Sequence, residues 1–100
     1  MGSDVLQGMV LDAIANDYES IQDVVHQVRG FCLQEGLMTP TIDQIVEVAK
    51  TLIDAGLARA YRLKIDSDPL VVETIDWSEI GELYFYRSSR GLAILRELGG

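Results

Sequence analysis

The chain has 100 residues, of which 48% are hydrophobic, and a formal net charge of −8. A chain of this length forms one domain and buries enough apolar surface to fold without a metal or a disulfide. Cys32 is the only cysteine, which excludes an intramolecular disulfide and a cysteine-rich metal site, and we expect a buried thiol. No apolar run reaches the roughly 20 residues of a membrane span, and the N-terminus lacks the basic start of a signal peptide, so the expected location is the cytoplasm.

The negative charge is concentrated in the first 56 residues, which hold nine acids against two bases. Residues 57–100 hold seven acids and six bases and are close to neutral. Proteins that bind nucleic acids take much of their affinity from Lys and Arg side chains that contact phosphates. The charge of the first half therefore disfavours nucleic acid as its partner, and any basic surface belongs to the second half.

Two helices are predicted at the start of the chain, over about residues 4–16 and 20–35. Apolar residues at helical spacing are expected to form the buried face of the first helix: Leu6, Met9, Val10, Ala13 and Ile14. After a polar break at residues 17–20, Ser20 is expected to cap the second helix, and Gly36 to end it in a left-handed conformation. The expected buried face of this second helix is Ile21, Val24, Val25, Val28, Phe31 and Cys32.

A third helix is predicted over about residues 40–55, with Thr39 or Thr41 as its N-cap and Gly56 as its stop. Its apolar stripe has a period of 3.6 residues and consists of Ile42, Ile45, Val46, Ala49, Leu52 and Ile53. The outward positions are Asp43, Gln44, Glu47, Lys50, Thr51 and Asp54. The exposed face of this helix is thus expected to carry three acids and one base.

From Leu57 the apolar period changes to two, which predicts wing strands over about 57–66 and 82–87. Residues 70–75 are a candidate further short strand, and residues 76–81 a single helical turn or a loop. A last helix is predicted over about 89–98, capped by Ser88 or Ser89. This order predicts a mainly α protein with a small β hairpin, of the α+β class. The specific expectation is a single winged helix-turn-helix domain over residues 1–100, with three helices, a two- to three-stranded wing and a C-terminal helix.

Two segments resemble winged-helix proteins of the MarR and PadR-like kind. Residues 41–62, TIDQIVEVAKTLIDAGLARAYR, look like the recognition helix of this family with its Leu-x-x-x-Gly-Leu exit into the wing. Residues 84–98, YFYRSSRGLAILREL, are similar to the family's Tyr-Tyr-x-Leu-Thr-x-x-Gly-x-x-x-Leu passage from strand to helix. In this second match Ser88 takes the place of the capping threonine, Gly91 that of the helix glycine and Leu95 that of the packing leucine, while Arg87 replaces an apolar residue.

The resemblance implies that the chain binds DNA as a dimer through the third helix and the wing. On this sequence the contacts would be Thr41, Gln44 and Lys50 from the helix and Arg59, Arg62 and Lys64 from the wing, and a dimer would gather Arg87 and Arg90 into the same basic edge. Asp43 and Glu47 oppose this reading, because phosphates and the acceptor groups of guanine repel a carboxylate. We therefore expect a non-enzymatic, regulatory protein–protein interaction module, with another protein or a second copy as its partner. A DNA-binding transcriptional regulator is the alternative.

The candidate protein-interface residues belong to the acidic helix face and to the aromatic part of the wing: Asp43, Glu47, Asp54, Trp77, Tyr84 and Tyr86. Trp77 either packs back on the core or anchors a partner. Aromatic residues interleaved with arginines also suit single-stranded nucleic acid, but a cover for the third helix or a dimer contact is the favoured role. We expect no enzyme, cofactor or metal, because the sequence has no nucleophile motif or phosphate-cradling loop and only one histidine, His26. A small-molecule sensor is a weaker hypothesis, since no polar constellation supports it.

Overall fold

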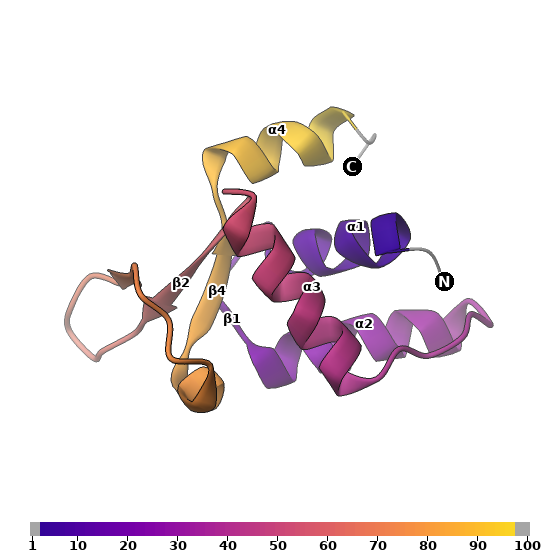
Figure 1. Cartoon of the computed structure of the whole chain (residues 1–100), viewed down its shortest axis with the longest axis horizontal. Coiled ribbons are helices and arrows are strands. Elements are labelled where there is room, and N and C mark those ends of the chain that lie inside the picture. The colour runs from indigo at the N-terminus through magenta and orange to yellow at the C-terminus, as the bar shows by residue number, and fades with distance from the viewer. Residues whose placement is uncertain (1–2, 98–100) are drawn as a thin grey trace.

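The computed structural model describes residues 3–97, which form an α+β fold with five helices and a four-stranded antiparallel sheet. Figure 1 shows α1, α2 and α3 gathered at one end of the molecule and the loop between β2 and β3 projecting at the other. The elements in chain order are α1 (Ser3–Ala13), β1 (Glu19–Ser20), α2 (Ile21–Gln34), α3 (Ile42–Asp54), β2 (Ala58–Arg62), β3 (Leu70–Val72), the 3-10 helix η1 (Trp77–Glu82), β4 (Tyr84–Arg87) and α4 (Ser89–Glu97). The predicted end of the last helix at Leu98 lies outside the described residues.

The helix caps follow the sequence signals. Ser20 Oγ accepts a hydrogen bond from the Asp23 amide at 3.2 Å at the start of α2. Of the two candidate caps of α3, Thr41 serves: its Oγ1 accepts from the Gln44 amide at 3.1 Å, and Gln44 Oε1 accepts from the Thr41 amide at 2.8 Å. This reciprocal pair is a capping box, and it makes Ile42 rather than residue 40 the first helical residue.

Both predicted glycine stops are confirmed, since Gly36 and Gly56 have φ angles of +70° and +75°. The first helix is shorter than expected, because α1 ends at Ala13 and not near residue 16. Its last turn is followed by a bend that brings Glu19 and Ser20 to the sheet as β1.

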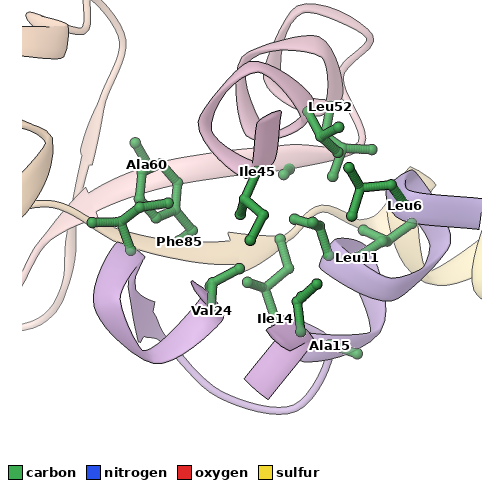
Figure 2. Close-up of a cluster of buried hydrophobic side chains, with 14 of the residues drawn as sticks. Leu6, Leu11, Ile14, Ala15, Val24, Ile45, Leu52, Ala60 and Phe85 are labelled. Carbon is green, nitrogen blue, oxygen red and sulfur yellow. The ribbon is translucent and has the colours of Figure 1, made fainter. Parts of the chain in front are cut away.

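The core lies between the three N-terminal helices and the sheet. In Figure 2 labelled side chains from α1, α2 and α3 converge on Ala60 of β2 and Phe85 of β4. The buried stripes are shifted from the predicted ones: Leu11 and Val48 are buried, whereas Phe31 and Ile42 are 47% and 53% exposed. Leu11 is buried because α1 also contacts α4, so its apolar face is wider than the single stripe that periodicity predicts.

The strand order in the sheet is β1-β4-β2-β3. The short β1, predicted as a polar break, pairs antiparallel with β4, with Glu19 opposite Phe85 and Ser20 opposite Tyr84. The strand β2 ends at Arg62 and not near residue 66, where Asp66 adopts a φ of +63° in a turn. Ile65, which the predicted strand over 57–66 would have placed at one of its alternating apolar positions, is consequently 92% exposed.

The start of α4 is held against the turn between α3 and β2. Of the two serines that could cap α4, Ser88 is the cap, because its Oγ accepts from the Gly91 amide at 3.0 Å. The same hydroxyl donates to the Gly56 carbonyl at 2.6 Å, and the Ser88 amide donates to the Leu57 carbonyl at 3.0 Å. A side chain on Gly91 would collide with the Leu57 carbonyl oxygen, so the glycine permits this close approach.

None of the helices within residues 3–97 has the length and apolar character that crossing a membrane requires.

Candidate functional site

The exposed face of α3 is acidic, and its candidate DNA-contacting side chains interact within the domain. Asp43, Glu47 and Asp54 are exposed. Lys50 Nζ lies 3.3 Å from Glu47 Oε1 and 5.2 Å from the centre of the Trp77 ring, so the only base of this helix is held by an ion pair and a cation–π contact. Gln44 is committed to the capping box. All three helix residues expected to contact DNA, Thr41, Gln44 and Lys50, therefore have partners within the domain.

An open apolar groove lies between α2 and the start of α3. We call it the α2–α3 groove; its volume is about 430 Å³, and it is lined by Ile21, Gln22, Val25, His26, Arg29, Gly30, Leu33 and Ile42. Leu33 is 71% exposed, and Met38, in the connection to α3, is 80% exposed. His26 lies on the exposed side of α2, as predicted. The groove and the connection together leave an apolar surface beside the acidic face of α3.

The segment after β3 folds back over the sheet and neutralises Arg62. Arg62 Nη2 lies 2.8 Å from Glu79 Oε2, and Nη1 lies 3.6 Å from Glu82 Oε2, so both carboxylates of η1 share one guanidinium. Trp77 is half buried and packs back on the core, with its ring parallel to that of Phe85 at a centroid distance of 6.5 Å. The candidate wing base Arg62 and the candidate anchor Trp77 thus contact other parts of the same domain.

A second groove lies on the side of the sheet that faces away from the core. It has a volume of about 370 Å³, and we call it the arginine–tyrosine groove after the side chains that line it: Arg59, Arg87, Arg90, Tyr18, Tyr61 and Tyr86, with Gly56, Ser88 and Ser89. The strand register explains its position, because Ala58 and Ala60 of β2 point into the core and the intervening Arg59 points outward, opposite Tyr86. The hydrogen bonds of Ser88 bring the start of α4 to the same place.

Tyr18 packs on the other two tyrosines of this groove. The Tyr18 ring lies 4.7 Å from that of Tyr86 and 5.0 Å from that of Tyr61, the latter in an edge-to-face arrangement. The Arg87 guanidinium lies 4.7 Å from the centre of the Tyr86 ring. Tyr18 belongs to the predicted polar break and was not among the candidate residues; an aromatic residue inside a polar segment was the available signal.

The arginines of the groove form no ion pair with a described side chain. Among residues 5–97, no ion pair involves Arg59, Arg87 or Arg90. Arg87 Nε is buried and has no hydrogen-bond partner in the described part of the chain, a state that costs about 1–3 kcal/mol for a typical polar group. No carboxylate lines the groove. This is consequently a local positive surface on a protein with a net charge of −8.

The residues predicted to form one basic edge lie on two faces. Arg62 is paired with η1, whose Trp77 lies beneath Lys50 of α3, whereas Arg59, Arg87 and Arg90 lie in the arginine–tyrosine groove. Lys64 is exposed beyond the end of β2, and Thr41 is occupied as a cap. Tyr84, opposite Tyr61 in the sheet, is half buried and does not line the groove.

Two carboxyl groups have shifted pKa values. Burial, followed by the neighbouring charges of Asp23 and Asp17, raises the pKa of Glu19 in β1. Hydrogen bonds from the Ser78 hydroxyl and amide lower the pKa of Asp76, which caps η1. Neither group lines either groove. Among the described residues, no three His, Cys, Asp or Glu side chains are placed to hold a metal ion.

A scan against protein-family models and searches of curated proteins and of solved structures each gave no match. Function is therefore inferred from the surfaces described above.

Proposed function

We propose that this chain is a winged-helix domain that acts as a non-enzymatic, regulatory protein–protein interaction module. The order of its elements supports the winged-helix part: a helix and a short strand precede two helices, and a strand pair follows, with β4 between β1 and β2. In DNA-binding members of this fold class the third helix lies in the major groove. The surface of α3 therefore bears most directly on the choice between DNA and a protein.

The single observation that carries the proposal is the acidic face of α3 beside an apolar groove. Asp43, Glu47 and Asp54 are exposed, and Lys50 is paired with Glu47 and Trp77. Phosphates would meet carboxylates where a DNA-binding helix offers donors. A protein surface that carries Lys or Arg beside apolar side chains complements the same face in both charge and polarity.

The partner that fits is an amphipathic helix with basic residues along one flank. Such a helix places apolar anchors at positions i, i+3, i+4 and i+7 in a groove, and the α2–α3 groove is apolar and open. Ile42 lines the groove and Asp43 follows it directly, with Glu47 one turn further along α3. The flank of the bound helix that faces α3 would therefore carry the positive charges, and the flank that faces His26 and Arg29 would not.

The test uses a synthetic helical peptide with leucines at those four positions and lysines along one flank, and a matched peptide with glutamates in place of the lysines. We expect the lysine peptide to bind at least tenfold more tightly in a fluorescence anisotropy titration at low salt. The double variant Asp43→Lys/Glu47→Lys should lose at least tenfold in affinity for the lysine peptide. Asp68→Lys/Glu73→Lys changes the net charge equally at two exposed positions on either side of β3 and should stay within threefold of the unmodified protein.

Equal losses in the two double variants would overturn the proposal, because the attraction would then come from the net charge alone. A second arm uses duplex DNA in large excess at low salt, for which no mobility shift is expected. Tight, salt-sensitive binding that disappears in Arg62→Glu/Lys64→Glu would instead favour the DNA-binding regulator.

A further inference from the structure

Three of the eight basic residues of this acidic chain line one groove that the proposed protein contact does not use. The arginine–tyrosine groove lies on the side of the sheet that faces away from the core, whereas the α2–α3 groove lies between two helices. Arg59, Arg87 and Arg90 line the same groove, and its lining includes no carboxylate, so their positive charges repel one another. A bound anion would remove that repulsion.

The chemistry of the lining is that of a phosphate site. The guanidinium group has a planar fork of donors that matches the oxygens of a phosphate, and it stays charged at all physiological pH values. Arg87 lines the groove, and its buried Nε has no hydrogen-bond partner among the described residues, so this guanidinium is not fully paired within the chain. Three tyrosines, whose hydroxyl groups are hydrogen-bond donors, also line the groove.

The backbone adds a second source of positive potential. The nine-residue helix α4 starts at Ser89, and Ser88, Ser89 and Arg90 all line the groove. The Gly91 amide is used by the Ser88 cap, whereas the amides of Ser89 and Arg90 precede the first intrahelical hydrogen bond. The positive end of a helix dipole and such amides favour a bound anion, and here they reinforce the arginines.

The size of the groove and the charge around it limit the ligand to a small molecule. A volume of about 370 Å³ lies at the lower end of the range of small-molecule sites. A long polyanion would extend past the groove over a chain whose first 56 residues hold nine acids against two bases. Charges are screened over about 8 Å at physiological ionic strength, so a compact anion experiences mainly the arginines.

We propose that the arginine–tyrosine groove binds a small phosphorylated molecule, with its phosphate oxygens on the Arg59, Arg87 and Arg90 guanidiniums. This site is independent of the protein contact proposed above. The phosphate can be inorganic or part of an organic ester, and the probes below distinguish these two sources.

The experiment measures the binding of pyrophosphate, ADP, adenosine and a 12-nucleotide single strand of DNA by backbone amide chemical shifts in NMR titrations at 50 mM salt. We expect pyrophosphate and ADP to shift amides of β2, β4 and the first turn of α4, and adenosine to cause no shift. Tighter binding of ADP than of pyrophosphate would identify an organic ester as the ligand type, and equal or weaker binding would identify the inorganic group.

Variants locate the site. Arg59→Ala/Arg90→Ala should weaken the binding of pyrophosphate by at least tenfold, and the folded state of the variant is verified by its unchanged amide dispersion. Arg96→Ala removes an exposed charge from the last turn of the same helix, outside the groove, and should stay within twofold. Asp43→Lys/Glu47→Lys should not weaken pyrophosphate binding, which separates this site from the proposed protein contact.

Four results would overturn the proposal. The first is that neither pyrophosphate nor ADP binds at millimolar concentrations, and the second is that the groove variant and the Arg96 variant lose equal affinity for pyrophosphate. The third is that adenosine binds as tightly as ADP. The fourth is that only the single strand of DNA binds. The last result would assign the groove to nucleic acid instead.

Discussion

At the scale of single residues, one glycine permits the contact between α4 and the turn that joins α3 to β2. Gly91 is buried, and it lets α4 approach the Leu57 carbonyl at the exit of α3. Leu11 of α1 lies on the other side of the same position, so three segments meet there. The contact fixes where Ser89 and Arg90 enter the arginine–tyrosine groove.

We predict that Gly91→Ala lowers the free energy of unfolding by about 3 kcal/mol, at the upper end of overpacking costs, because the added Cβ meets backbone atoms and not a flexible side chain. Gly30→Ala is the matched control. Gly30 lies within α2 with no atom near the added Cβ, so alanine there should stabilise the protein by about 0.5–1 kcal/mol. Urea unfolding measures both, and a neutral Gly91→Ala would show that α4 is not tightly docked.

A second residue-scale prediction concerns Glu19, whose pKa is raised by burial and by Asp23 and Asp17. A raised folded-state pKa means that this carboxyl contributes stability when protonated, and that the contribution is lost as pH rises through the folded-state pKa. Glu19→Gln should therefore raise the melting temperature at pH 7, and the advantage should shrink below about pH 4, where the glutamate is also neutral. Glu73→Gln in the exposed loop is the control. An equal gain at both pH values would contradict this cause.

At the scale of elements, η1 acts as a clamp on the sheet. Its carboxylates Glu79 and Glu82 hold Arg62, and its first residue, Trp77, packs on Phe85 and beneath Lys50. The segment between β3 and β4 is thereby tied to both the sheet and α3. The clamp also removes Arg62 from the charge available to a nucleic acid.

We predict that Arg62→Ala accelerates amide hydrogen exchange over residues 70–82, because the two carboxylates lose their common partner. The free energy of unfolding should fall by only about 0–1 kcal/mol, as is typical of partly exposed ion pairs. Lys64→Ala, at an exposed position beyond the same strand, should leave both quantities unchanged. Unchanged exchange in Arg62→Ala would mean that Trp77 and the β2–β3 pairing hold the segment without the ion pairs.

At the scale of the whole molecule, the domain separates its charges between an acidic helical surface and a small basic groove. Local patterns in the sequence predicted the acidic part, because helical periodicity places Asp43, Glu47 and Asp54 on one side of α3 and the structure exposes all three. The capping residues Ser20 and Thr41 were also predictable, since a cap depends on neighbours within four residues.

Features that depend on distant pairing were not predictable from local patterns. A two-residue strand such as β1 has no periodicity of its own and exists because β4 pairs with it. The alignment of Tyr18 with Tyr61 and Tyr86 likewise appears only when the sheet is assembled. The division of the expected basic edge, by contrast, follows from local alternation: Arg59 and Arg62 are three residues apart in one strand and thus point to opposite faces.

The pairing of Glu19 with Phe85 also bears on how the protein folds. The sheet cannot close until a segment 66 positions later in the chain has reached β1, so its assembly must overcome the entropy of a long loop. During synthesis on a ribosome, α1, α2 and α3 would emerge before β2 and β4. Until those strands emerge, the apolar side of the helices that faces the sheet would stay exposed to water. The acidic surface of these helices would keep such a half-made chain apart from other copies of itself by mutual repulsion.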